Sequence, residues 1–292
     1  NLGFEVSVGF AGKIAQAVLG FAGTVVFARE LGPSKFGGVY FLITVVTLLR
    51  QFSGYEEGAK QRLAGTEIDD GEVLGAVTVL NLAVTVLAGV LLFAASGPLV
   101  DRTGLARPAL LGTLMVCTVV FFSTYQTLLN AAGGLGRQVW LDTVRSVLTT
   151  PLQIGLVVAG VGAAGVIYGI VGATVLVIPV TLYSLGVRPT VPSVATLRSL
   201  WAYARYNIPS SFVGKTYDEY DVVLLVLLFS QLEVGFYQAA LKFTLPAMFI
   251  TQVSGSGLMT RVANRHGQGA AYDDDLTNVL AYASLFAIPI LF

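Results

Sequence analysis

Charged residues are scarce in this chain of 292 residues: they make up 12% of it, whereas a soluble domain carries about 25%. Hydrophobic residues make up 55%, a composition that excludes an ordinary soluble enzyme and a disordered tail. The 17 Lys and Arg residues balance the 17 Asp and Glu residues, so the chain lacks the basic character of a nucleic-acid binder. These deficits favour a membrane protein.

Cysteine and histidine occur once each, as Cys117 and His266. Cys117 has no second cysteine for an intrachain disulfide or a metal site, and its apolar surroundings suit a small buried side chain. The phosphate-binding sequence Gly-x4-Gly-Lys-Ser/Thr is also missing, so the chain is not itself an ATP-driven motor. We therefore expect no catalytic residue, no metal and no cofactor, and we do not expect an enzyme.

Glycine and long apolar runs are abundant. The 33 glycines compare with about 20 at average usage, which suits closely packed membrane helices. Since a spanning helix needs about 20 apolar residues, the runs predict eight spans and the start of a ninth. These are residues 9–28, 36–55, 73–95, 108–130, 142–160, 166–185, 207–230 and 234–259, and the residues from 276 onward.

The segment before the seventh predicted span is different in character. Between Arg188 and Arg205, apolar side chains recur at helical spacing from Leu197 to Ala204, which predicts a short amphipathic helix on the membrane surface. Lys and Arg in short loops favour a cytoplasmic N-terminus. Eight of them then lie inside (Lys60, Arg62, Arg137, Arg188, Arg198, Arg205, Arg261, Arg265) and four outside (Arg29, Lys35, Arg102, Arg107).

A short internal repeat suggests two groups of helices. Gly38-Val39-Tyr40 matches Gly235-Phe236-Tyr237 at an offset of 197 residues, and both segments follow the first helix of a group. Duplicated helix bundles are the usual architecture of secondary transporters. The fold class that we predict is therefore all-α: a polytopic transmembrane bundle of two six-helix lobes related by an internal repeat. Residues 1–190 form the first lobe, and residues 191–292 form the surface helix and a truncated second lobe.

The same segments resemble a known family. Residues 28–33, Ala-Arg-Glu-Leu-Gly-Pro, with residues 36–40, Phe-Gly-Gly-Val-Tyr, are similar to the signature after the first helix of polysaccharide and lipid-linked oligosaccharide flippases. Arg205 to Pro209 and Glu233 to Ala240 are similar to that family's pattern in helices seven and eight. The superfamily also holds the multidrug and toxin extrusion transporters and the lipid II flippase. Its members have twelve to fourteen spans, so the resemblance implies that this chain is about two-thirds of a longer protein.

Charges inside the predicted spans are the candidate binding residues, because such charges are costly and usually line a polar cavity. They are Lys13, Arg50, Lys215, Asp218 and Lys242. The alternative is that they neutralise one another or reach the membrane surface, since Lys215 and Asp218 have the spacing of an intrahelical pair. For Arg145 and Asp142, near a predicted helix end, we favour the structural pair.

The resemblance implies a flippase that moves lipid-linked oligosaccharide or polysaccharide precursors across the cytoplasmic membrane by alternating access. Its partners would be membrane lipids and a lipid-linked sugar with a phosphate or pyrophosphate headgroup, with no nucleic acid, and it would act as a monomer. A cationic path suits such an anion, because Lys and Arg donate hydrogen bonds to phosphate oxygens. The alternatives are a cation-coupled multidrug exporter of the same superfamily and a polytopic membrane glycosyltransferase or polymerase.

Overall fold

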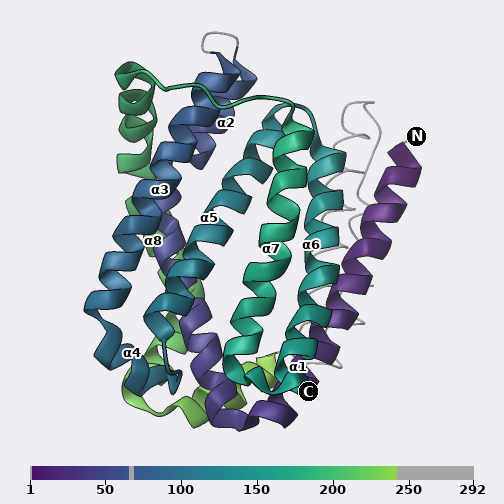
Figure 1. Ribbon diagram of the computed structural model, residues 1–292, viewed down its shortest axis with the longest axis vertical. Coiled ribbons are helices and arrows are strands. Elements are labelled where there is room, and N and C mark those ends of the chain that lie inside the picture. Colours follow the sequence, from purple (N-terminus) through teal and green to yellow (C-terminus); the bar gives the residue numbers. More distant parts are fainter. Residues whose placement is uncertain (1, 66–68, 242–292) are drawn as a thin grey trace, which may run out of the picture. The chain divides into compact units, whose positions relative to one another are not determined.

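The structure is a computed structural model that describes residues 2–65 and 69–241, and these residues form helices and connecting turns without any strand (Figure 1). Residues 1–236 form one compact unit and residues 237–292 another. Most of the predicted eighth span, the start of the ninth and Lys242 lie outside the described residues. The architecture below is that of the first unit.

The first element, α1 (Leu2–Leu49), contains a sharp break at Gly32, whose backbone lies at φ 72° and ψ 164°. Glycine adopts this conformation without the steric cost that a side chain would bring, and Pro33 begins the next helical stretch. Figure 1 shows the chain reversing its direction there, so that the two halves of α1 run antiparallel. The two helices predicted here and the turn between them are thus confirmed.

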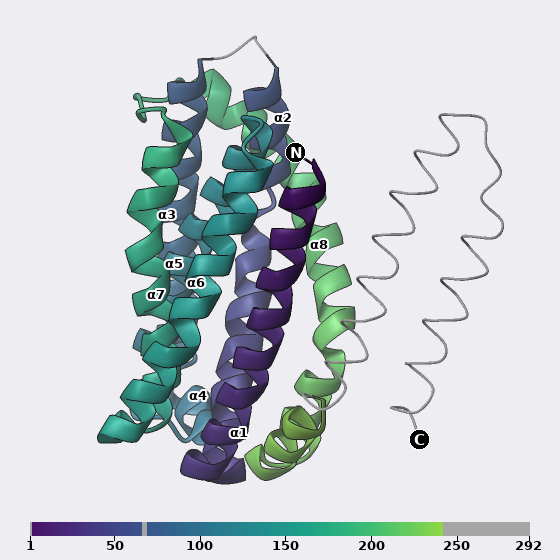
Figure 2. The same ribbon diagram turned by 90° about the vertical axis from the view of Figure 1, so that its right-hand side faces the viewer.

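Four further helices stand side by side with α1 (Figure 2): α3 (Asp70–Ala94), α5 (Pro108–Ala131), α6 (Leu135–Leu156) and α7 (Ala163–Leu185). A π-helical turn (Val157–Val161) and Gly162, at φ 68°, join α6 to α7 where the sequence predicts a reversal. Among the described residues, five helical segments are long and apolar enough to cross a membrane. The outward faces of α3 and α7 carry exposed apolar side chains such as Val86, Val90 and Leu176.

Two short helices replace stretches that the sequence suggests are loops: α2 (Glu56–Ala64) and α4 (Ser96–Thr103). In α2, Glu56 and Glu57 occupy the first turn and Arg62 the last, which suits the helix dipole. The residues between the predicted second and third spans are therefore not all connecting loop, because a search for long apolar runs overlooks a short helix that buries Gly58, Ala59 and Leu63.

The predicted surface helix and the predicted seventh span are one continuous helix, α8 (Val194–Leu228), capped by the hydroxyl of Ser193. Leu200 and Ala204 are buried rather than turned to a membrane surface. Arg62 of α2 donates to the Ser199 hydroxyl over 3.0 Å and to its carbonyl over 3.2 Å. The expected separate surface helix is therefore wrong, since this segment continues into α8 and packs Leu200 and Ala204 within the protein, although Trp201 stays exposed.

The connection from α7 to α8 crosses the N-terminal end of α3, as the upper part of Figure 1 shows. The backbone N–H of Thr190 donates to the carbonyl of Gly71 over 2.9 Å. Glu72 then accepts hydrogen bonds of 2.8 Å from the backbone of Ser193 and from the hydroxyl of Thr196. The beginning of α8 is thus tied to the beginning of α3.

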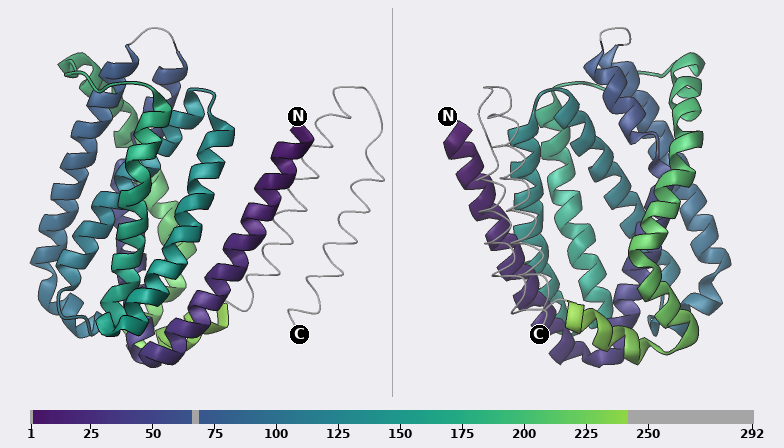
Figure 3. Two further views of the ribbon diagram at one scale, coloured as in Figure 1. Left: turned by 45° about the vertical axis from the view of Figure 1, so that its right-hand side comes forward. Right: turned by 180° about the vertical axis from the view of Figure 1, so that it is seen from behind.

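At the opposite end, the turn in α1 packs against the helix that begins at Gln231 (Figure 3). The Ser34 hydroxyl donates to Gln231 Oε1 over 3.2 Å, and Gln231 Nε2 donates to the carbonyl of Asp101 over 2.7 Å. A Cβ on Gly37 would lie 2.0 Å from the Gln231 carbonyl oxygen, so the backbones touch directly. We call this contact the Ser34–Gln231 contact.

Ser230 and Glu233 form the N-terminal cap of the helix that begins at Gln231. The Glu233 carboxylate accepts from the backbone N–H of Ser230 over 3.0 Å and from its hydroxyl. Such a reciprocal cap satisfies donors at a helix start. The Ser230 hydroxyl, followed by backbone hydrogen bonds, holds the pKa of Glu233 below its ordinary value of 4.5.

Candidate functional site

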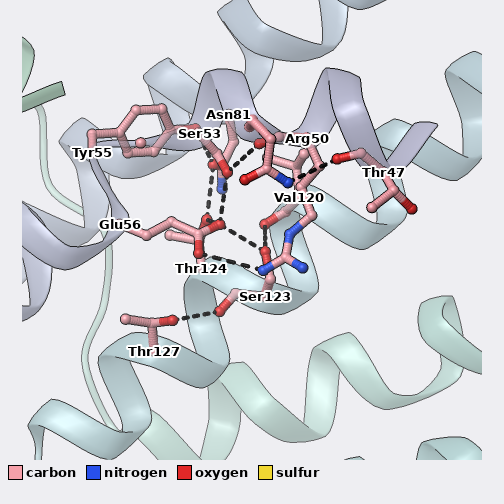
Figure 4. Close-up of polar contacts among 12 residues, drawn as sticks. Thr47, Arg50, Ser53, Tyr55, Glu56, Asn81, Val120, Ser123, Thr124 and Thr127 are labelled. Carbon is pink, nitrogen blue, oxygen red and sulfur yellow. Dashed lines mark hydrogen bonds and ion pairs between the residues drawn. The ribbon is translucent and has the colours of Figure 1, made fainter. Parts of the chain in front are cut away.

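A polar cluster lies where α1 ends and α2 begins, joined by the short helix η1 (Arg50–Ser53). The carboxylate of Glu56 is its centre (Figure 4): Oε1 accepts from the hydroxyls of Ser53, Ser123 and Thr124 over 3.0, 2.7 and 3.1 Å. Arg50 Nη2 lies 3.7 Å from Oε2. We call these five residues the Glu56 cluster.

The Glu56 cluster continues into the protein through Asn81 of α3, which is fully buried. Asn81 Oδ1 accepts from the hydroxyl of Tyr55 over 2.5 Å and from that of Thr124 over 3.1 Å. Three elements, α2, α3 and α5, are therefore joined by hydroxyl, amide and carboxylate groups. Because buried polar groups are costly when unpaired, this network fixes the position of Glu56 and hence of its ion-pair partner Arg50.

One cavity, of about 370 Å³, opens beside the Glu56 cluster among α5, α6 and α7, and we call it the α5–α7 cavity. Its walls combine cationic, amide and hydroxyl groups. They are formed by Arg50, Val119, Phe122, Ser123, Gln126, Thr127, Gln138, Val139, Asp142, Arg145 and Thr174. Arg145 Nη2 donates to Asp142 Oδ1 over 3.1 Å, and the guanidinium carbon lies 4.7 Å from the ring centroid of Phe122. The pair expected to be structural therefore forms, and both its members line the cavity.

A second cavity, of about 440 Å³, lies between η1 and α8, and we call it the α8 cavity. It is lined by Thr47, Arg50, Gln51, Ser53, Gly54, Glu56, Glu57, Thr127, Asn207, Ser211 and Lys215. Arg50 and Thr127 belong to both cavities, so the Arg50 guanidinium stands at the boundary between them. In the described part of the chain the arrangement provides two neighbouring polar chambers that share one cation.

The structure places the five predicted binding residues differently. Arg50 and Lys215 line the α8 cavity together, although 165 positions separate them in the chain. Lys215 Nζ lies 3.5 Å from Asp218 and 3.3 Å from Glu219, so the expected intrahelical pair forms, while the Asp218 side chain is 63% exposed and lines neither cavity. Lys13 lies within α1, and its side chain is outside the described part, as is Lys242.

The sequence analysis does not single out the remaining members of the site. Glu56 lies just beyond the end of the predicted second span, and Asn81, Ser123, Thr124 and Gln126 are uncharged residues inside apolar runs. The available signal was an amide within a predicted span: such groups are uncommon in membrane helices and seek partners there. The hydroxyls of Ser123 and Thr124 reach Glu56 only because α2 packs against α5. No local sequence pattern encodes that packing.

Comparison with known proteins agrees with this architecture. Two curated relatives from Haloferax volcanii, the probable low-salt glycan biosynthesis flippase Agl15 and the probable flippase AglR, are each 24% identical over 97% and 96% of this chain. The chain spans 60% of the length of each relative. Among solved structures, the MATE multidrug transporter DinF-BH aligns with a TM-score of 0.61 at 15% identity, over 97% of this chain and 69% of the transporter.

These likenesses establish a multi-pass, all-helical membrane protein with the fold of this transporter class. The family model described as "Polysaccharide biosynthesis protein" matches residues 26–292, which is most of the chain. The chain therefore belongs to the polysaccharide biosynthesis protein family.

Proposed function

We propose that the protein is a flippase that moves lipid-linked oligosaccharide or polysaccharide precursors across the cytoplasmic membrane by alternating access, with its N-terminus in the cytoplasm. The observation that carries this proposal is the position of Arg50 between two polar cavities inside an apolar bundle. Lys215 lines one of them and Arg145 the other. The names of the two Haloferax relatives support the same activity.

The chemistry of the cavities suits such a substrate. A lipid-linked glycan carries a phosphate or pyrophosphate, and this anion must pass about 30 Å of hydrocarbon that cannot solvate it. Cations on the path replace the lost water, and a guanidinium can bind two phosphate oxygens at once. The lipid tail can meanwhile remain in the bilayer. Transport of this kind forms and breaks no covalent bond, so the side chains act by binding alone.

Transport by reconstituted protein tests the proposal. Full-length protein in proteoliposomes should move a fluorescent polyprenyl diphosphate-linked sugar between the leaflets. Arg50→Gln removes a charged hydrogen-bond donor, a loss of about 1.5–3 kcal/mol in binding free energy that corresponds to about 12- to 140-fold in affinity for the lipid-linked sugar. Arg198→Gln, at an exposed position of α8, is the matched control and should transport like the wild type. Wild-type protein that moves no lipid-linked sugar would refute the function.

A cation-coupled multidrug exporter is the second candidate, because the fold resembles that of DinF-BH and because two acids, Glu56 and Asp142, line the cavities. Each acid is paired with an arginine, which leaves less negative potential for a cationic drug. Transport of a lipophilic cationic dye in the same proteoliposomes distinguishes the two functions. We expect the rate of dye transport to be no higher than in empty vesicles. Dye export that depends on Glu56 would favour the exporter.

A further inference from the structure

Gln126 of α5 is a buried amide that has no hydrogen-bond partner among the residues that the structure describes. Its side chain is 5% exposed and lines the α5–α7 cavity. Neither its Nε2 nor its Oε1 atom has a hydrogen-bond partner among the described residues. The same is true of two buried atoms on the facing helix α6, Gln138 Oε1 and Arg145 Nε, and both of those residues line the same cavity.

Four unpaired polar atoms in one cavity are unusual, because folded proteins pair nearly all their buried polar groups. Gln153 of α6 is a useful contrast. It is buried to a similar extent, lies outside both cavities, and donates through Nε2 to the carbonyl of Val166 over 3.0 Å. Asn81 Nδ2, which lies outside both cavities, is also unpaired among the described residues, but the α5–α7 cavity is where several such atoms lie together.

The pattern of unpaired donors and acceptors indicates which kind of ligand could form hydrogen bonds with them. The Gln126 amide presents a donor and an acceptor side by side, and Gln138 and Arg145 add an acceptor and a donor across the cavity. Groups that donate and accept at adjacent positions are the vicinal hydroxyls of a sugar. The hydroxyls of Ser123, Thr127 and Thr174 on the same walls already donate within the protein and retain lone pairs for a further hydroxyl.

We propose that the α5–α7 cavity is a subsite for the sugar nearest to the phosphate, recognised through Gln126 with Gln138 and Arg145, and that Arg50 holds the phosphate at the boundary with the α8 cavity. The volume of about 370 Å³ lies in the lower part of the range of small-molecule sites, about 300–1,000 Å³, and suits a small carbohydrate moiety. This inference rests on the proposed flippase function.

The test compares two probes on full-length protein in lipid nanodiscs: a polyprenyl diphosphate and the same lipid bearing one hexose. Wild-type protein should bind the hexose lipid about tenfold more tightly, the effect of two neutral hydrogen bonds. Gln126→Leu should lose most of this preference, because only the contacts of Gln138 and Arg145 with the sugar remain, and its affinity for the sugar-free lipid should be unchanged. Gln138→Leu, at a half-buried position, should narrow the difference and keeps the test valid if Gln126→Leu fails to fold.

Each outcome separates the two levels of the proposal. A wild-type protein that binds both lipids equally, or variants that retain the full preference for the hexose lipid, would overturn the sugar subsite and leave the flippase function standing. A wild-type protein that binds neither lipid would overturn the function on which the subsite depends. Loss of affinity for the sugar-free lipid in Gln126→Leu would show that the amide acts on the phosphate or the fold, and would also overturn the subsite.

Discussion

The Ser34–Gln231 contact can be tested through a single added methyl group. In Gly37→Ala the new Cβ would lie 2.0 Å from the Gln231 carbonyl oxygen and 2.6 Å from the Gly235 nitrogen, and both are backbone atoms that cannot rotate away. Ordinary contact begins at 3.4 Å, so the two backbones must separate by about 1.4 Å. The hydrogen bond from Ser34 to Gln231, 3.2 Å long, would then be lost.

Overpacking of this kind costs about 1–3 kcal/mol. For a protein of this size the cost corresponds to a fall of roughly 2–12 °C in the midpoint of thermal unfolding, measured on purified protein in detergent. Gly172→Ala is the matched control, because Gly172 lies inside α7 with no atom within 4 Å of an added Cβ. Its midpoint should stay equal or rise slightly, since alanine favours a helix over glycine by about 0.5–1 kcal/mol.

A second measurement reports the contact itself. Cysteines at positions 34 and 231, in a background of Cys117→Ala, should be joined by a short bismaleimide, and adding Gly37→Ala should reduce the yield several-fold. An unfolding midpoint equal to that of the wild type, together with undiminished cross-linking, would refute the argument. It would mean that the turn of α1 and the helix from Gln231 do not touch as the structure describes.

Two further substitutions test the hydrogen-bond network of Asn81 and the helix cap formed by Glu233. Asn81→Leu leaves the buried hydroxyl of Tyr55 without its acceptor, whereas Thr124 keeps Glu56 as an acceptor. We therefore expect a loss of about 1–3 kcal/mol in thermal unfolding experiments, and an unchanged midpoint would contradict the network around Glu56. Glu233→Gln removes a carboxylate whose pKa is lowered in the folded state, so its stabilising effect is present above pH 4.5 and is lost as the pH falls through the folded value. The unfolding midpoints of wild type and variant should therefore differ at pH 7 and converge toward pH 3, and a constant difference would argue against the cap.

The long helices were predictable because each one coincides with a contiguous run of apolar residues, which the sequence displays directly. The break at Gly32 and the reversal after Val161 each need a glycine in a conformation that other residues avoid, and each lies at the end of a long apolar run. Both turns can therefore be read from the sequence. The short helix α2 does not, because its burial of Ala59 and Leu63 depends on neighbours far along the chain. Helix boundaries were also missed where polar residues extend a helix beyond its apolar run, as in α6, which begins at Leu135.

The candidate site was predictable to a smaller extent. Charge inside a span pointed to Arg50 and Lys215, which share a cavity, but the same criterion selected Asp218, which is exposed. Burial depends on which face of α8 meets α1, and the short polar stretch around Lys215 carries charges on more than one face. Gln126 carries no charge, so this criterion does not select it. It is a candidate because its amide has no hydrogen-bond partner among the described residues, and that property depends on the packed structure.

The attachment of the start of α8 to α3 has a mechanical consequence. With Glu72 holding Ser193 and Thr196, a tilt of α8 that keeps these hydrogen bonds would pivot near its N-terminal end, and the helix would act as a lever. At 1.5 Å per residue, Lys215 lies about 32 Å from this pivot, and a tilt of about 10° would carry it about 6 Å. The same tilt would move the far end by about 9 Å and break the hydrogen bond from Arg102 to the Val226 carbonyl. A small rotation at one end is thus enough to change the width of the α8 cavity beside Arg50.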